Sequence, residues 1–148
     1  MTAILVDTNV LVYAYDIGEP GKQTQAMDLL EQLKISGQAC LSAQCLGEFF
    51  SAVTRGPAPR LRRRTSAAHA ELLANSFPVL NLTPLIVLEA IRGARAHQLS
   101  YYDAQIWAAA RMNQVAFIFS EDFQDGMSLD GVKFVNPFSN RFKLEEWI

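Results

Sequence analysis

Four acidic residues are the side chains of this sequence whose type and placement could do chemistry together: Asp7, Glu48, Asp103 and Asp122. Carboxylates crowded into one place repel and raise one another's pKa values, and a divalent cation removes that repulsion. Mg²⁺ and Mn²⁺ prefer oxygen ligands, and an ion held in this way can activate water for attack on phosphorus. The acids therefore predict a metal site for phosphate chemistry, provided that the fold brings them together.

Each of these acids also has an ordinary structural interpretation when it is taken alone. An aspartate that follows a strand or begins a helix is usually a cap or a turn residue. Glu48 is harder to explain in this way, because it lies beside Phe49 and Phe50 on an otherwise apolar helix face. The four acids together indicate more than any one of them, since the structural interpretation must account for each separately.

The elements that must position these acids alternate between strand and helix. Short apolar runs predict strands at 4–6, 39–41, 79–82, 115–119 and 132–135. Apolar residues at helical spacing predict helices near 10–15, 22–34, 65–75 and 102–113, and others that begin after the N-caps Ser42 and Thr83. This alternation predicts an α/β fold, a three-layer α/β/α arrangement with a central, mostly parallel sheet of about five strands. We expect a single domain over 1–148, in which the residues from about 139 form a C-terminal extension.

The helix that begins at Pro84 has a predicted inward face of its own. Its buried positions are expected at Ile86, Val87 or Leu88, Ala90, Ile91 and Ala94. They follow the spacing of an amphipathic helix packed on a sheet.

The topology brings three of the acids to one end of the sheet. In an open α/β sheet, ligands bind beyond the carboxyl ends of the strands, where the strand order reverses. Asp7 directly follows the first strand, and Asp122 follows the fourth, so the two share a crevice if these strands are neighbours. Glu48 lies on the helix after the second strand and can face the same end. Asp103 lies on a helix that does not follow a strand directly, and topology alone does not place it.

Composition sets limits on the kind of protein. The formal net charge is −2, and no run of about 18 uncharged apolar residues is present to span a membrane. The first residues lack a basic leader, so we expect a cytoplasmic protein. Cys40 and Cys45 have no further cysteine or histidine partners, which favours two small buried or half-buried side chains over a zinc site or a disulfide.

The motifs around the acids carry a family resemblance. The segments LVDTNVL, SAQCLGEF, SYYDAQIWAAA and SEDF lie in order at 5–11, 42–49, 100–110 and 120–123, and VNPF follows at 135–138. This collinear pattern resembles the PIN-domain family, and within it the VapC-type toxins of bacterial toxin–antitoxin pairs. The resemblance covers nearly the whole chain, from Ile4 to Phe138.

The resemblance implies a function and a set of ligands. It implies Mg²⁺- or Mn²⁺-dependent cleavage of RNA, a homodimer, and neutralisation by a cognate antitoxin. The catalytic acids would be Asp7, Glu48, Asp103 and Asp122. The metal ligands would be Asp7, Asp103 and Asp122, with Glu48 and Asp125 as candidates for further ligands. Asp125 has an equally simple interpretation as a turn residue before Gly126.

Neighbouring residues gain roles from the same resemblance. Asn9 and Ser120 are placed to hydrogen-bond the acids or a metal-bound water. Thr8 could do the same, or it could cap the following helix. A group of arginines could contact RNA phosphates or the antitoxin, or form a solvated helix end: Arg55, Arg60, Arg62, Arg63 and Arg64.

Three other functions are alternatives to that of a ribonuclease. A phosphotransferase of the haloacid-dehalogenase type needs a second aspartate two residues after the first, and Asn9 stands in that place. A non-catalytic PIN-like binding module would be favoured if one of the acids were missing, and all four are present. DNA is the remaining rival, because metal-assisted cleavage does not itself select the sugar, and RNA is implied by the resemblance alone.

Overall fold

Six strands form one mixed sheet in the computed structural model, which describes residues 3–148. The strands are β1 (Ile4–Val6), β2 (Ala39–Ser42), β3 (Val79–Leu80), β4 (Phe117–Phe119), β5 (Ser128–Leu129) and β6 (Val132–Val135). Their order across the sheet is β3-β2-β1-β4-β6-β5. Every neighbouring pair is parallel except β5 and β6. The predicted mostly parallel sheet is confirmed, with one strand more than expected.

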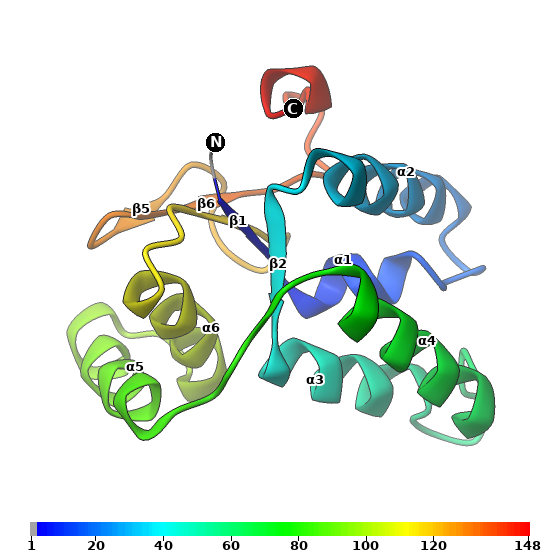
Figure 1. The fold of residues 1–148 in the computed structure, drawn as a ribbon, viewed down its shortest axis with the longest axis horizontal. Coiled ribbons are helices and arrows are strands. Elements are labelled where there is room, and N and C mark those ends of the chain that lie inside the picture. The colour runs from blue at the N-terminus through cyan, green and yellow to red at the C-terminus, as the bar shows by residue number, and fades with distance from the viewer. Residues whose placement is uncertain (1–2) are drawn as a thin grey trace.

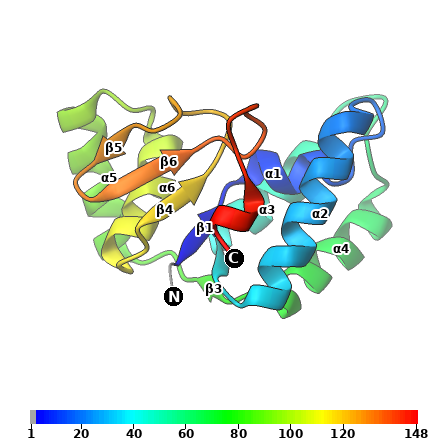
Figure 2. The same cartoon turned by 90° about the horizontal axis from the view of Figure 1, so that it is seen from above.

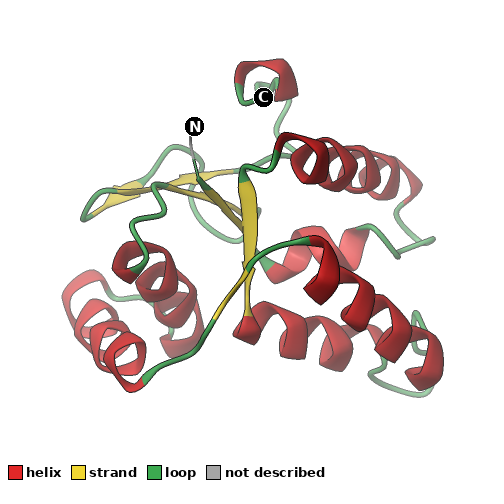
Figure 3. Ribbon diagram, in the orientation of Figure 1, coloured by secondary structure: helices red, strands yellow, loops and turns green. Residues whose placement is uncertain are grey.

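Helices cover both faces of this sheet. They are α1 (Thr8–Tyr13), α2 (Pro20–Ser36), α3 (Ala43–Val53), α4 (Arg63–Ser76), α5 (Pro84–His97) and α6 (Tyr101–Met112), followed by the short 3-10 helix η1 (Leu144–Glu146). Helices α1 to α4 lie on one side of the sheet, and α5 and α6 lie on the other (Figures 1 and 2). The three predicted layers are visible in Figure 3. Within residues 3–148, no helix combines the length and the apolar character needed to cross a membrane.

The additional strand, β5, belongs to a tight hairpin with β6. Leu129 pairs with Val132, and the two residues between them, Asp130 and Gly131, have φ values of 48° and 86°. Two consecutive positive φ angles are typical of the turns that join antiparallel strands, and Asp-Gly is a strong signal for such a turn. The sequence therefore contained the signal for β5, although the strand itself is only two residues long.

Two strands are shorter than predicted for local reasons. The strand expected over 115–119 begins at Phe117, because the backbone N–H of Val115 donates to the carbonyl of Ala110 and completes the end of α6. The strand expected over 79–82 ends at Leu80, at the edge of the sheet where only β2 pairs with it. The chain then turns away to α5, whose first turn is capped by the Thr83 hydroxyl at 3.3 Å from the N–H of Ile86.

The predicted inward face of α5 is partly wrong. Ile86, Ala90 and Gly93 are buried, but the side chains of Leu88 and Ile91 are 62% and 45% exposed. The reason is that α5 packs mainly against α6 and not broadly on the sheet. Periodicity predicted a wide apolar stripe, whereas pairing of two helices buries a narrow one.

The C-terminal extension packs back on the sheet. The ring of Trp147 meets Phe117 and Phe119 edge to face, with centroid separations of 4.8 and 5.1 Å. Edge-to-face pairs of this kind add to the stability gained from burial alone. The last residues therefore cover the face of β4 in the part of the structure seen at the top of Figure 1.

Candidate active site

Asp7 and Asp122 come from the same edge of the sheet because β1 and β4 are neighbours. Val6 of β1 lies opposite Phe119 of β4 in a parallel pair, and the order of the strands reverses between them. The N–H of Asp7 donates to the carbonyl of Phe119 at 3.0 Å, so the two strands leave the sheet together. The chain segments that carry Asp7 and Asp122 therefore start at the same edge of the sheet.

Asp7 is a buried carboxylate at the start of α1. Its side chain is only 2% exposed and accepts hydrogen bonds from the N–H of Thr8 and the hydroxyl of Ser120, both at 2.7 Å. Burial raises the pKa of Asp7 to about 7 in spite of these two donors, and the negative charges of Asp122 and Glu48 add to the rise. Asp7 thus caps the helix, and its negative charge is unfavourable because the side chain is buried.

Asn9 and Ser120 join Asp7 to Asp122. The Asn9 amide lies 2.9 Å from the Ser120 hydroxyl, 3.1 Å from an Asp122 carboxylate oxygen and 3.3 Å from the second oxygen of Asp7. The Ser120 hydroxyl also accepts from the N–H of Asp122 at 3.1 Å. Both residues therefore hydrogen-bond the acids directly.

Glu48 is held from two sides. The hydroxyl of Thr8 donates to one of its oxygens at 2.9 Å, and the amide of Gln44 donates to the other at 2.7 Å. The Thr8 side chain hydrogen-bonds an acid and does not cap α1, because Asp7 itself caps that helix. Gln44 was missed by sequence reasoning, although its place one turn before Glu48 on α3 is the spacing at which helical side chains meet.

Asp103 lies in the first turn of α6, which is capped by Ser100. Burial raises the pKa of Asp103, and the charges of Asp122 and Glu48 raise it further. These are the same two charges that act on Asp7. The acid that topology could not place therefore lies near enough to Asp122 and Glu48 for their charges to act on it.

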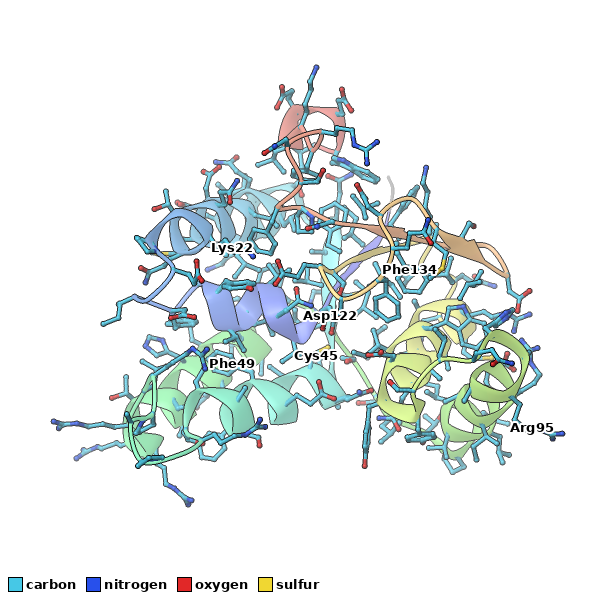
Figure 4. All side chains as sticks on the ribbon, turned by 180° about the vertical axis from the view of Figure 1, so that it is seen from behind. Lys22, Cys45, Phe49, Arg95, Asp122 and Phe134 are labelled. Carbon is cyan, nitrogen blue, oxygen red and sulfur yellow. The ribbon has the colours of Figure 1, made fainter. Side chains whose placement is uncertain are left out.

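A second polar cluster, also missed from the sequence, anchors the Asp122 segment. The Lys22 ammonium group lies 2.8 Å from Glu121, and the Tyr13 hydroxyl donates to the other oxygen of the same carboxylate. The bond to Glu121 is the main reason that the pKa of Tyr13 is raised. Figure 4 shows Lys22 on α2, with Asp122 nearer the middle of the molecule. Glu121 thus ties the segment after β4 to the helices α1 and α2.

The four acids offer the type of ligand atom, carboxylate oxygen, that Mg²⁺ and Mn²⁺ prefer. Burial is the main cause of the raised pKa values of Asp7 and Asp103, and the charges of Asp122 and Glu48 add to it; a divalent cation would favour the ionised form of both. Within residues 3–148, no group of three His, Cys, Asp or Glu side chains is arranged to hold an ion as it stands. Such a group is not required for Mg²⁺, which is commonly bound by one or two carboxylates together with water and substrate phosphate.

Asp125 and the arginines lie apart from this centre. Asp125 accepts from the N–H of Asn136 at 2.9 Å and lies 3.9 Å from Arg141, so its contacts are with the C-terminal segment. Arg60 pairs with Asp16 at 3.1 Å. The other arginines are exposed around the loop between α3 and α4, beyond the end of α3 that is remote from the sheet (Figure 1): Arg55, Arg62, Arg63 and Arg64.

Both cysteines are free and buried, as predicted. Burial raises the pKa of the Cys45 thiol to about 12, and the nearby charge of Asp7 adds to the rise. Cys45 shares a hydrogen bond with Ser42 at 3.0 Å. A thiol in this state is a packing group, since the reactive form of cysteine is the thiolate.

The fold and the site together define a class of protein. It is an α/β domain with acids beyond the switch point of a parallel sheet, which is the place between β1 and β4 where the strand order reverses. The chain belongs to the PIN domain family, whose model matches residues 4–124. This result confirms the resemblance found in the sequence.

Solved structures agree with this family. A toxin–antitoxin complex from Klebsiella pneumoniae superposes with a TM-score of 0.68 at 18% identity, over 92% of this chain and 98% of that one. VapC20 from Mycobacterium tuberculosis, described as a Sarcin-Ricin loop cleaving toxin, gives 0.64 at 21% identity, over 81% and 90%. DNA-bound VapBC from Salmonella typhimurium gives 0.66 at 16% identity, over 90% and 97%. No curated protein matches the chain.

Proposed function

We propose that this protein is a Mg²⁺- or Mn²⁺-dependent endoribonuclease that acts in the cytoplasm as the toxin of a toxin–antitoxin pair. One observation carries the nuclease proposal: Asn9 and Ser120 hydrogen-bond Asp7 and Asp122 into one unit at the switch point of the sheet. Membership of the PIN domain family supports it.

The residues divide into those that would hold the ion and those that hold the ligands in place. Asp7, Asp103 and Asp122 are the proposed ligands, and Glu48 is the candidate for a fourth. When bound, the ion would lower the pKa of a water and stabilise charge on the leaving oxygen. Asn9 orients the carboxylates of Asp7 and Asp122 with a single amide group, and such supporting hydrogen bonds typically change metal affinity or activity by about 10- to 100-fold.

The choice of RNA and the toxin role rest on resemblance. The similar structure from Klebsiella pneumoniae is a toxin–antitoxin complex, and the one from Salmonella typhimurium is VapBC bound to DNA. VapC20 from Mycobacterium tuberculosis is described as a toxin that cleaves the Sarcin-Ricin loop. The exposed arginine loop supports the proposal, because arginines bind phosphates of nucleic acid without regard to sequence. Its place beyond the far end of α3 suits contact with RNA or antitoxin away from the acids.

A homodimer is supported by an apolar surface on α5. Leu85, Leu88 and Ile91 are 65%, 62% and 45% exposed, and Leu82 just before the helix is 49% exposed. All four residues lie within 82–91, and exposed apolar patches mark protein–protein interfaces. Leu82 follows β3, the edge strand of the sheet, by two residues.

Cleavage by the purified chain, free of any partner, tests the proposal. RNA should be cut with Mg²⁺ or Mn²⁺ and left intact with EDTA, and Asp7→Asn should abolish cleavage without changing the circular dichroism spectrum. Asp28→Asn, which removes an exposed acid on α2, is the matched control and should remain active.

Each other outcome has a definite meaning. Cleavage of DNA but not of RNA with the same sequence would identify a DNA-directed enzyme. Binding of nucleic acid without cleavage, under any divalent cation, would identify a non-catalytic module. Full activity of Asp7→Asn would refute the proposed site.

A further inference from the structure

Gln44 connects the two sides of the molecule at the acidic site. Its amide nitrogen donates to a carboxylate oxygen of Glu48 at 2.7 Å and to the backbone carbonyl of Tyr102 at 3.0 Å. Gln44 and Glu48 belong to α3, whereas Tyr102 belongs to α6, and Figure 1 shows these helices on opposite sides of the sheet. One amide group therefore bridges the two helices that carry acids.

The orientation of this amide is fixed by a second glutamine. Gln105 is only 5% exposed; its amide nitrogen donates to the Gln44 oxygen at 2.8 Å, and its own oxygen accepts from the hydroxyl of Tyr101 at 2.8 Å. A tyrosine hydroxyl and an amide nitrogen supply the protons, so the chain of bonds runs in one direction, from Tyr101 to Glu48. Reversing Gln44 would place its oxygen against the oxygens of Glu48 and Tyr102.

The bridge made by Gln44 ends at Glu48 on one side and next to Asp103 on the other. Tyr102 immediately precedes Asp103, and Gln105 follows it by two residues, so Gln44 and Gln105 hold the first turn of α6 that carries Asp103. The other end of the bridge holds Glu48. We propose that Gln44 is a positioning residue that sets the separation of the Glu48 and Asp103 carboxylates, and that Gln105 keeps its amide turned toward Glu48. This inference rests on the proposed metal-dependent function of the same site.

Two substitutions separate positioning from simple packing. Gln44→Met keeps the length of the side chain but leaves Glu48 and the Tyr102 carbonyl without their donor. Gln105→Glu keeps the bond from Tyr101, but its carboxylate attracts the Gln44 nitrogen and turns the Gln44 oxygen toward Glu48. Gln25→Met, at an exposed position on α2, is the matched control.

Crystal structures of the metal-free variants and Mn²⁺ titration of each give two independent readouts. In Gln44→Met and Gln105→Glu, we expect the Glu48 and Asp103 carboxylates to separate by an additional distance on the order of 1 Å, a displacement that can cost about 100-fold in rate. Mn²⁺ should bind about tenfold more weakly, as for other supporting residues of metal sites. The kcat for RNA should fall while KM is unchanged, because both glutamine amides are engaged in hydrogen bonds within the chain. Gln25→Met should match the wild type in all of these measurements.

The inference and the proposed function fail in different ways. An unchanged carboxylate separation in both variants, or Mn²⁺ affinity equal to that of the wild type, would overturn the positioning role. A wild-type chain that binds no Mn²⁺ would overturn the metal-dependent function, and the crystallographic separation would still decide the role of Gln44. If Gln44→Met does not fold, Gln105→Glu tests the same bridge.

Discussion

Replacing Asp7 with asparagine should make the metal-free chain more stable at neutral and alkaline pH, although it removes the proposed active site. Asp7 is 2% exposed, and burial raises its pKa from the ordinary 3.8 to about 7. A carboxylate that must ionise in such a place destabilises the fold, and a neutral amide of the same shape does not ionise. Stability and activity should therefore change in opposite directions.

The size of this effect follows from the shift in pKa. Since one pKa unit is worth about 1.4 kcal/mol, a rise from 3.8 to about 7 corresponds to about 4 kcal/mol. Between these two pH values the folded chain keeps the Asp7 proton and the unfolded chain releases it, so the free energy of unfolding of the wild type falls as the pH rises. Asparagine has one acceptor oxygen in place of two, and the loss of one hydrogen bond, from Thr8 or Ser120, offsets about 1 kcal/mol of the gain.

Urea denaturation in EDTA at pH 5 and pH 8 measures the difference. The advantage of Asp7→Asn over the wild type should be small at the lower pH and should reach about 2–3 kcal/mol at the higher one. Asp28→Asn, at an exposed position, should show no such change with pH. Adding Mn²⁺ at about 100 times its Kd should stabilise the wild type by about 2.7 kcal/mol and leave Asp7→Asn unaffected.

A difference in stability that is the same at both pH values would refute this reasoning. It would mean that Asp7 is not kept protonated by its surroundings. An Asp7→Asn variant that Mn²⁺ stabilises as much as it stabilises the wild type would show separately that Asp7 is not a ligand.

Three further variants test other parts of the molecule. Ser120→Ala removes a donor to Asp7, so the pKa of Asp7 should rise above its wild-type value in an NMR titration, and Mn²⁺ should bind about tenfold more weakly. Gly93→Ala places a methyl group against the ring of the buried Trp107 and should lower the free energy of unfolding by about 1–3 kcal/mol in urea. Replacing the arginines at 62–64 with alanine should weaken RNA binding and lower the slope of log K against log salt by up to about 2, with kcat unchanged.

Matched controls accompany these variants. Ser51→Ala, at an exposed position on α3, should leave the pKa of Asp7 as it is in the wild type. Gly47→Ala adds a methyl group in open space on the same helix and should not destabilise the fold. Arg95→Ala, on α5, should leave the salt dependence unchanged. Gly93→Ala with wild-type stability, or an unchanged salt slope in the arginine variant, would contradict the corresponding prediction.

The sheet, and the place of Asp7, Asp122 and Glu48 at one end of it, could be predicted from the sequence because the signals are local. Asp7 directly follows a buried apolar run, and Asp122 lies three residues beyond another, so the adjacency of β1 and β4 was enough to bring them together. Asp103 could be placed only by resemblance, because the position of α6 depends on its packing against α5 and the sheet.

The supporting polar groups were harder to predict for a physical reason. Gln44 and Gln105 are 61 residues apart, and nothing in the sequence near either one indicates that their amides meet. Glu121 likewise pairs with Lys22 across 99 residues. The exposed face of α5 was misjudged because apolar periodicity does not reveal whether a helix packs on a sheet, on one other helix, or on a second molecule.

The hydrogen bond from the Thr8 N–H to the Asp7 carboxylate also offers a spectroscopic handle on the site. This amide belongs to the first turn of α1, where no backbone carbonyl within the helix is available to it. Protonation of Asp7, or withdrawal of its electrons by a cation, weakens the acceptor and should move the Thr8 amide resonance and speed its exchange with solvent. A single backbone proton would then report the occupancy of the acidic site in a chain that carries no label beyond ¹⁵N.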